Sequence, residues 1–151
     1  MRPLYVLPLL LSVLLIPEIA HAQMRPTIGY VRNTSYGCSE YLSFASDHQR
    51  FVETQYATEL GLVFYNPDIG EPQALVHIDE EDIVVSLVNT IQSGDIEIRS
   101  YLPQNRMFEV TLQISVGSYS EEGEGVEWRG EMTVSKNGAK TTVPVRGGAG
   151  C

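Results

Sequence analysis

The chain has 151 residues, of which 19% are charged and 43% are hydrophobic, and its formal net charge at pH 7 is −9. This negative charge would repel phosphate groups and anionic lipid headgroups, so it argues against nucleic acid and anionic membranes as partners. A basic protein partner is compatible with it.

The first 22 residues have the pattern of a secretory signal peptide. Arg2 supplies the positive start, residues 4–16 form an apolar run, and Ala20-His21-Ala22 is a cleavage site of small residues. The apolar run is shorter than the roughly 20 residues that a transmembrane helix needs. We therefore expect residues 1–22 to be removed and residues 23–151 to form a single soluble β domain, without membrane insertion, in the periplasm or outside the cell.

The two cysteines, Cys38 and Cys151, are expected to form a disulfide bond. Cysteines of exported domains normally pair, because their compartment is oxidising. In the chain-entropy model, closing a loop of about 100 residues contributes at most about 4.7 kcal/mol. The glycine-rich residues 147–150 give the C-terminal tail little reason to order itself, so we expect the disulfide to fasten it.

The N-terminal part of the mature chain predicts one strand and one ambiguous segment. Residues 36–44 are a plausible first strand that carries Cys38. In residues 46–60, Ser46 with Gln49 resembles the capping box of a helix. The same segment also alternates like a strand at Val52, Thr54, Tyr56 and Thr58. We favour irregular or strand structure there.

The middle of the chain predicts three strands. Residues 74–78 and 83–88 are short apolar runs typical of strands buried on both faces, joined by the four-residue acidic turn 79–82. Residues 96–102 alternate, which predicts a strand ending at Pro103 with its apolar side chains inside and its polar ones outside. The apolar set is Ile96, Ile98 and Leu102, and the other set is Glu97, Arg99 and Tyr101.

The C-terminal third predicts a register as well as strands. Apolar residues alternate with polar ones over residues 108–116 and 126–134. Asn137-Gly138 is typical of a type I′ hairpin, which would pair Lys136 with Ala139 and place Met132, Val134, Val143 and Val145 on one face. Because Pro144 lacks an N–H group, we expect the last strand to be an edge strand.

These seven or so short strands, with turns about every ten residues, predict an all-β fold. An antiparallel β-sandwich or a small β-barrel, stapled by one disulfide, would satisfy the pattern.

The sequence contains no local motif for catalysis. The mature chain has two histidines, His48 and His77, and neither stands beside a nucleophile motif, so we predict a protein without enzymatic activity and without a cofactor. Alternate residues on a strand share a face, so His77 with Asp79 and Glu81 is the one arrangement that merits a comparison with metal sites. A histidine at the end of a strand, next to a solvated turn, explains the same residues, and no metal site is predicted.

The function that this pattern favours is a non-enzymatic binding or accessory role with an unknown protein partner. Small exported inhibitors of lysozyme combine a signal peptide, a compact antiparallel barrel, one disulfide and an acidic surface, so inhibition of a basic hydrolase is an alternative. The chain resembles these inhibitors in such general features and shares no sequence motif with them. A metal-binding or hydrolytic protein using His77 is a further alternative. The carboxylates expected to steer a basic partner are Asp79, Glu80, Glu81, Asp82, Glu121, Glu122 and Glu124.

Overall fold

The computed structural model describes residues 24–35, 37–48, 61–119 and 125–150. The elements that lie wholly in these ranges are strands, and no helix that could cross a membrane was found in them. The signal segment 1–22, most of the ambiguous segment 46–60, and Cys151 lie outside the described residues. The strands are β1 (Ile28–Gly29), β2 (Ser39–Phe44), β3 (Leu62–Asn66), β4 (Gln73–Ile78), β5 (Glu81–Ser93), β6 (Ile96–Pro103), β7 (Glu109–Tyr119), β8 (Gly125–Lys136) and β9 (Ala139–Gly150).

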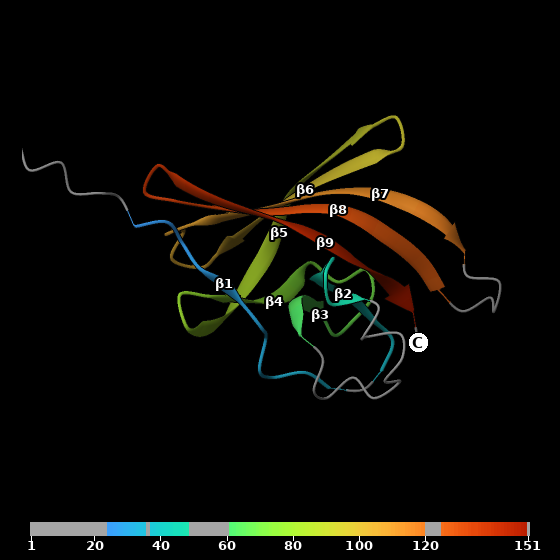
Figure 1. Ribbon diagram of the computed structural model, residues 1–151, viewed down its shortest axis with the longest axis horizontal. Helices are drawn as coiled ribbons and strands as arrows, with labels where there is room; N and C mark the ends of the chain where they lie inside the picture. Colours follow the sequence, from blue (N-terminus) through green and yellow to red (C-terminus); the bar gives the residue numbers. More distant parts are fainter. Residues whose placement is uncertain (1–23, 36, 49–60, 120–124, 151) are drawn as a thin grey trace, which may run out of the picture.

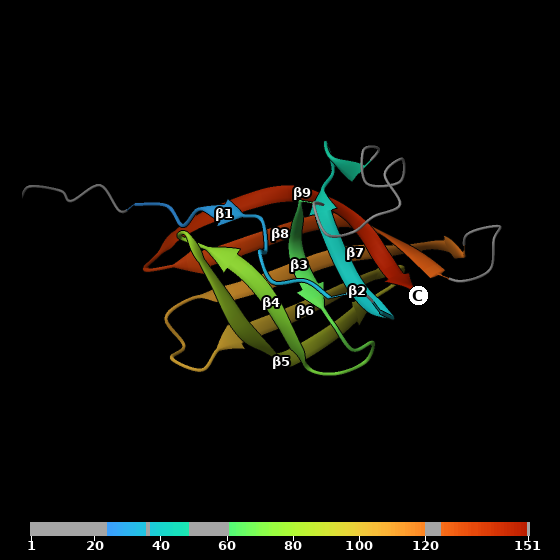
Figure 2. The same ribbon diagram turned by 90° about the horizontal axis from the view of Figure 1, so that it is seen from below.

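Eight of the strands close into an antiparallel barrel. The sheet runs in the order β4-β3-β2-β9-β8-β7-β6-β5, and β5 pairs back with β4. The short strand β1 adds to the end of β4 that β3 does not reach, which places it outside the barrel wall (Figures 1 and 2). The fold is therefore the barrel, and not the sandwich, of the two architectures that the sequence predicts.

All seven predicted strands are present, whereas β1 and β3 were not predicted. Every residue of β3 is buried, so the strand has no alternation that sequence patterning could detect. Phe64 packs in the barrel core, whereas Tyr65 packs outside the wall against Val31 of the N-terminal segment. The segment that buries the outer side of β3 is therefore distant from it in the sequence.

The hairpin at Asn137-Gly138 is confirmed with its predicted register. Both residues have positive φ, 50° and 79°, as a type I′ turn requires. Lys136 pairs with Ala139, and Val134 pairs with Thr141. The side chains predicted to share the inner face of this hairpin pack in or against the barrel core, namely Met132, Val134, Val143 and Val145.

The glycine-rich C-terminal tail is ordered by strand pairing, which the sequence did not predict. Residues 147–150 belong to β9, which pairs with β8 on one side and with β2 on the other. Glycine is needed at two of these positions because a Cβ on Gly147 would lie 1.9 Å from the carbonyl oxygen of Tyr41, and one on Gly148 would lie 2.0 Å from that of Val126. The run of glycines therefore allows neighbouring strands to approach closely.

The expectation that the last strand is an edge strand holds for only part of β9. β2 pairs with β9 from Val145 to Gly150, so this half is central in the sheet. The ladder ends at Pro144, whose carbonyl oxygen accepts a hydrogen bond from the N–H of Ala45. Because Pro144 cannot donate in return, it marks the point where β2 leaves β9.

The connection between β4 and β5 is tighter than predicted, and β5 is more exposed. Ile78 pairs with Glu81, so the turn consists of Asp79 and Glu80, which have φ of 49° and 74°. Val84 and Val88 are 52% and 53% exposed, so β5 is not buried on both faces. Strand β5 also runs past residue 88 to Ser93, because a second two-residue turn connects it to β6.

The predicted orientation of β6 was inverted. Tyr101 is 2% exposed and packs in the core, and Arg99 lies on the same face of the strand, opposite the buried Leu112. Ile96, in contrast, is 38% exposed. The polar row of β6 therefore faces the barrel interior, where it forms the ion pairs described below.

Candidate functional site

The barrel has two ends with different charge. One end carries the loop between β3 and β4, the turn between β5 and β6, and the ends of β7 and β9; we call it the acidic end because Asp68, Glu71 and Asp95 lie in its loop and turn. The opposite end carries the turn between β4 and β5 and the hairpin between β8 and β9 (Figure 1). The acidic turn 79–82 and the strand ends that flank Glu121, Glu122 and Glu124 in the sequence therefore lie at different ends of the barrel.

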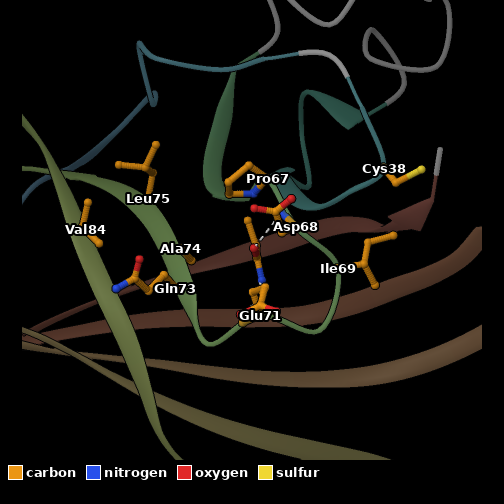
Figure 3. Close-up of a pocket in the computed structure, with 10 residues that line it drawn as sticks. Cys38, Pro67, Asp68, Ile69, Glu71, Gln73, Ala74, Leu75 and Val84 are labelled. Atoms are coloured by element: carbon orange, nitrogen blue, oxygen red, sulfur yellow. Dashed lines mark hydrogen bonds between the residues drawn. The ribbon is translucent and has the colours of Figure 1, made fainter.

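A groove of about 700 Å³ lies beside the loop between β3 and β4. Asn66 shapes this loop, because its amide donates a hydrogen bond to the carbonyl oxygen of Glu71 and accepts one from the N–H of Asp68. Figure 3 shows that the loop and β4 supply most of the lining, with Val84 of β5 and Cys38 at the margins. The groove is lined by Cys38, Asn66, Pro67, Asp68, Ile69, Glu71, Gln73, Ala74, Leu75 and Val84.

The loop and turn carboxylates of the acidic end are not neutralised by ion pairs within the part of the chain that the structure describes. Asp68, Glu71 and Asp95 form no ion pair there. Arg129 of β8 and Arg146 of β9 both contact Glu127. This end of the barrel consequently presents unpaired negative charge next to a groove.

A buried ion triad lies inside the same half of the barrel. Arg99 of β6 contacts Glu97 of the same strand and lies 3.2 Å from Glu40 of β2. Its guanidinium stacks 4.7 Å from the ring centroid of Trp128. The amide of Asn66 also donates to Glu40, at 3.3 Å. The triad thus ties β2, β3, β6 and β8 together across the interior.

Arg99 stays protonated although it is buried. Removal from water opposes the charged form, but the interactions with Glu97 and Tyr101 and the charge of Glu40 outweigh this and raise the pKa of Arg99. Arg99 therefore keeps its positive charge between the two glutamates. Since the Arg99 and Glu40 side chains are only 15% and 8% exposed, we interpret this cluster as a structural element of the barrel.

His77 forms a buried pair with Asp82 on the outside of the barrel wall. The Nδ1 atom of His77 lies 2.7 Å from Asp82, and both side chains are at most 10% exposed. Asp82 also accepts hydrogen bonds from the backbone N–H groups of Arg32 and Asn33. Gly29 is packed against the imidazole, because a Cβ there would lie 2.5 Å from its Cδ2 atom. The pair therefore fastens the N-terminal segment to β4 and β5.

The acidic turn at the opposite end is partly used for structure. Asp79 accepts from the N–H of Thr27 at 2.8 Å and from Lys136 at 2.6 Å, and the hydrogen bond from Lys136 is the main cause that lowers the pKa of Asp79. Glu80 and Glu81 remain exposed. Of the four predicted steering carboxylates in this turn, Asp79 and Asp82 are therefore occupied by contacts within the chain, and Glu80 lies 3.9 Å from Arg32.

The structure does not bring His77 together with Asp79 and Glu81. His77 points to Asp82, and Asp79 points to Lys136. A search of the described ranges found no group of three or more histidine, cysteine, aspartate or glutamate side chains that could hold a metal ion. Glu121, Glu122 and Glu124 lie outside the described residues.

Replacing Asp82 with asparagine is expected to lower the free energy of unfolding by about 1–3 kcal/mol near pH 7, because buried donors lose their acceptor. Burial favours the neutral carboxyl, but the hydrogen bonds from His77 and from the Arg32 backbone lower the pKa of Asp82. A depressed pKa stabilises the fold above about pH 4, and this stabilisation is lost as the pH falls through the folded-state value.

Urea unfolding near pH 7 and near pH 3 checks this expectation. The wild type should lose stability on acidification, and Asp82→Asn should lose less. The exposed neighbour provides a control, since Glu81→Gln should behave like the wild type at both pH values. An equal acid sensitivity of Asp82→Asn and the wild type would contradict the assignment.

The candidate functional residues outside the predicted set are those of the groove and the acidic end. Asp68 and Glu71 lie in one loop and Asp95 in a separate turn, and neither stretch shows a charge run, so no sequence signal singled them out. Only the barrel topology brings their loop and turn to the same end. Comparisons with protein-family models, with curated proteins and with solved structures found no match to this chain.

Proposed function

We propose that this chain is an exported, periplasmic or secreted, β-barrel domain with a non-enzymatic binding role, and that its acidic end docks a basic protein. The observation that supports this proposal is the unpaired charge of Asp68 and Glu71 beside a groove of about 700 Å³, with Asp95 in the turn between β5 and β6 at the same end. A focused negative potential raises the association rate with a cationic protein. The groove would receive a protruding side chain or loop of that partner.

The strand ends that flank residues 120–124 lie at the acidic end of the barrel. This segment contains Glu121, Glu122 and Glu124, and the strands that it joins have their ends at Tyr119 and Gly125, on the acidic side of the barrel. The turn between β4 and β5 lies at the other end, so the two predicted carboxylate clusters cannot act as one surface. We therefore assign the steering role to the end that carries the loop at 120–124.

A disulfide between Cys38 and Cys151 is part of the proposal. Ser39 pairs with Gly150 in the ladder of β2 and β9, and the two cysteines are the next residues on either strand. Cβ atoms of directly opposed residues lie within the range that a disulfide bridges. Intact mass after alkylation without reductant should show no modified cysteine, and two alkylated thiols would contradict the pairing.

Surface-capture kinetics against a basic lysozyme test the docking surface. The variant Asp68→Asn/Glu71→Gln/Asp95→Asn removes charge at the acidic end, and Glu80→Gln/Glu81→Gln/Glu109→Gln removes the same amount of charge from the opposite end. At low salt, the first variant should associate about tenfold more slowly than the wild type, and the second should associate at nearly the wild-type rate. High salt should remove the difference.

The outcomes separate the proposals. Equal slowing of both variants would mean that overall charge acts without a site, which would overturn the docking surface. Absence of saturable binding at low salt would remove inhibition of lysozyme as the specific form of the function. Binding without loss of lysozyme activity would leave a binding role and exclude inhibition.

A further inference from the structure

The hairpin of β5 and β6 extends beyond the closed part of the barrel. Strand β4 pairs with β5 only from Glu81 to Ser86, and a further hydrogen bond joins the N–H of Leu87 to Pro72. A bulge follows at Val88, where the register between β5 and β6 shifts. From there to Ser93, β5 pairs with β6 alone among the described strands, and Figure 1 shows this hairpin projecting away from the rest of the barrel. One edge of β5 is therefore open.

The open edge presents backbone groups that can bind another strand. The two-residue turn pairs Ser93 with Ile96, and the next pair that exchanges hydrogen bonds with β6 is Ile91 with Ile98. The N–H and C=O groups of Thr90 and Gln92 therefore point away from β6. Within the described part of the chain, no strand pairs with β5 on this side beyond Ser86.

Apart from the bulge at Val88, this edge lacks the features that usually protect an edge strand. The segment 83–93 contains no charged residue and no proline, in a chain whose net charge is −9. Its aliphatic side chains are unusually open to solvent, with Val88 at 53% and Ile91 at 51% exposure. Ile98 of β6 lies beside Ile91 and extends the apolar row.

We propose that the open edge of β5 pairs with the same edge of a second copy of this chain. An antiparallel arrangement centred on Ile91 is self-complementary, because Thr90 then exchanges backbone hydrogen bonds with Gln92 of the other copy, and the reverse. The two Ile91 side chains lie directly opposite each other, flanked by Ile98 on both sides. The paired segments carry no charge, so two molecules of the same negative sign meet where they do not repel each other.

Sedimentation velocity over a range of protein concentrations tests the proposal. The wild type should shift from monomer to dimer as the concentration rises. Ile91→Lys should weaken self-association by about tenfold or more, because it places two like charges opposite each other. Val84→Lys is the matched control, since Val84 is 52% exposed on the same strand but lies where β4 already pairs with β5.

A cysteine at the centre of the pairing provides a second test in protein whose fold is intact. Opposed residues of an antiparallel pair have Cα atoms close enough for a disulfide. Ile91→Cys should therefore give a covalent dimer under mild oxidation, and Val84→Cys should give none. Far-UV circular dichroism should show that both variants are folded.

The proposal is overturned if the wild type is monomeric at every concentration, if both lysine variants associate equally, or if particles larger than a dimer grow without limit. These results are distinct from failure of the acidic surface. The acidic-end variant Asp68→Asn/Glu71→Gln/Asp95→Asn leaves the segment 88–93 unchanged and should keep the wild-type association constant for the dimer.

Discussion

Replacing Arg99 with alanine is expected to lower the free energy of unfolding by about 3–5 kcal/mol, the cost of leaving a buried charge without its partner. Glu40 is 6% exposed and would keep only the amide of Asn66 as a partner among the contacts described above. The substitution also removes the guanidinium from the face of Trp128.

The chain contains a matched control for Arg99. Arg129 forms the same kind of pair with a glutamate two positions earlier, Glu127, but its side chain is 62% exposed. Arg129→Ala should therefore cost less than about 1 kcal/mol. Denaturant unfolding near pH 7 measures both variants. Similar losses in the two variants would show that the interior triad contributes no more than a surface ion pair.

Replacing Gly147 with alanine is expected to lower the free energy of unfolding by about 3 kcal/mol. The added Cβ would lie 1.9 Å from the carbonyl oxygen of Tyr41 and 2.9 Å from the Cα atom of Leu42, so the backbones of β2 and β9 would have to separate. Neither contact is with the end of a flexible side chain, so rotation of a side chain cannot relieve it.

Gly117→Ala is the control for this prediction. A Cβ at Gly117 would lie 3.1 Å from the carbonyl oxygen of Glu127, a contact that a small shift relieves. We expect its effect to stay below about 1 kcal/mol. Thermal and denaturant unfolding of the two variants give the comparison. If Gly147→Ala were as stable as the wild type, the close approach of β2 and β9 would be wrong.

The parts of the fold that sequence reasoning predicted are those determined by neighbouring residues. Asn137 and Gly138 specify their turn by backbone conformation alone, and the turn then sets the register from Lys136 with Ala139 onward. Alternation along β7 and β8 identified the inner face because Leu112, Met132 and their neighbours are apolar and lie on a single face of each strand.

The sequence predictions that were wrong or incomplete involve residues whose interaction partners are remote in the sequence. Alternation in β6 shows that its two faces differ, but Glu40, which stabilises Arg99 inside the barrel, lies 59 positions away. Asp82 likewise meets the backbone of Arg32, 50 positions earlier, so a carboxylate that looks solvated in the sequence is buried. The groove at the acidic end depends on barrel closure, which no local pattern encodes.

The ladder between β2 and β9 has a consequence for the order of folding. Strands β4 to β9 each pair with the next strand in the sequence, so this meander can form from local hairpins. Closure requires contacts such as the hydrogen bond from Ser43 to Arg146, which are 103 positions apart. Forming such long loops is entropically costly, so we expect formation of the meander to be the rate-limiting step and β2 and β3 to dock afterwards.

A late docking step means that interactions of β2 are absent from the folding transition state. A truncation such as Leu42→Ala, at a fully buried position of β2, should then accelerate unfolding and leave the folding rate nearly unchanged. Stopped-flow kinetics distinguish this from an early closure, in which folding itself would slow. The lifetime of the native barrel is consequently governed by the seam between β2 and β9, where the wall opens first.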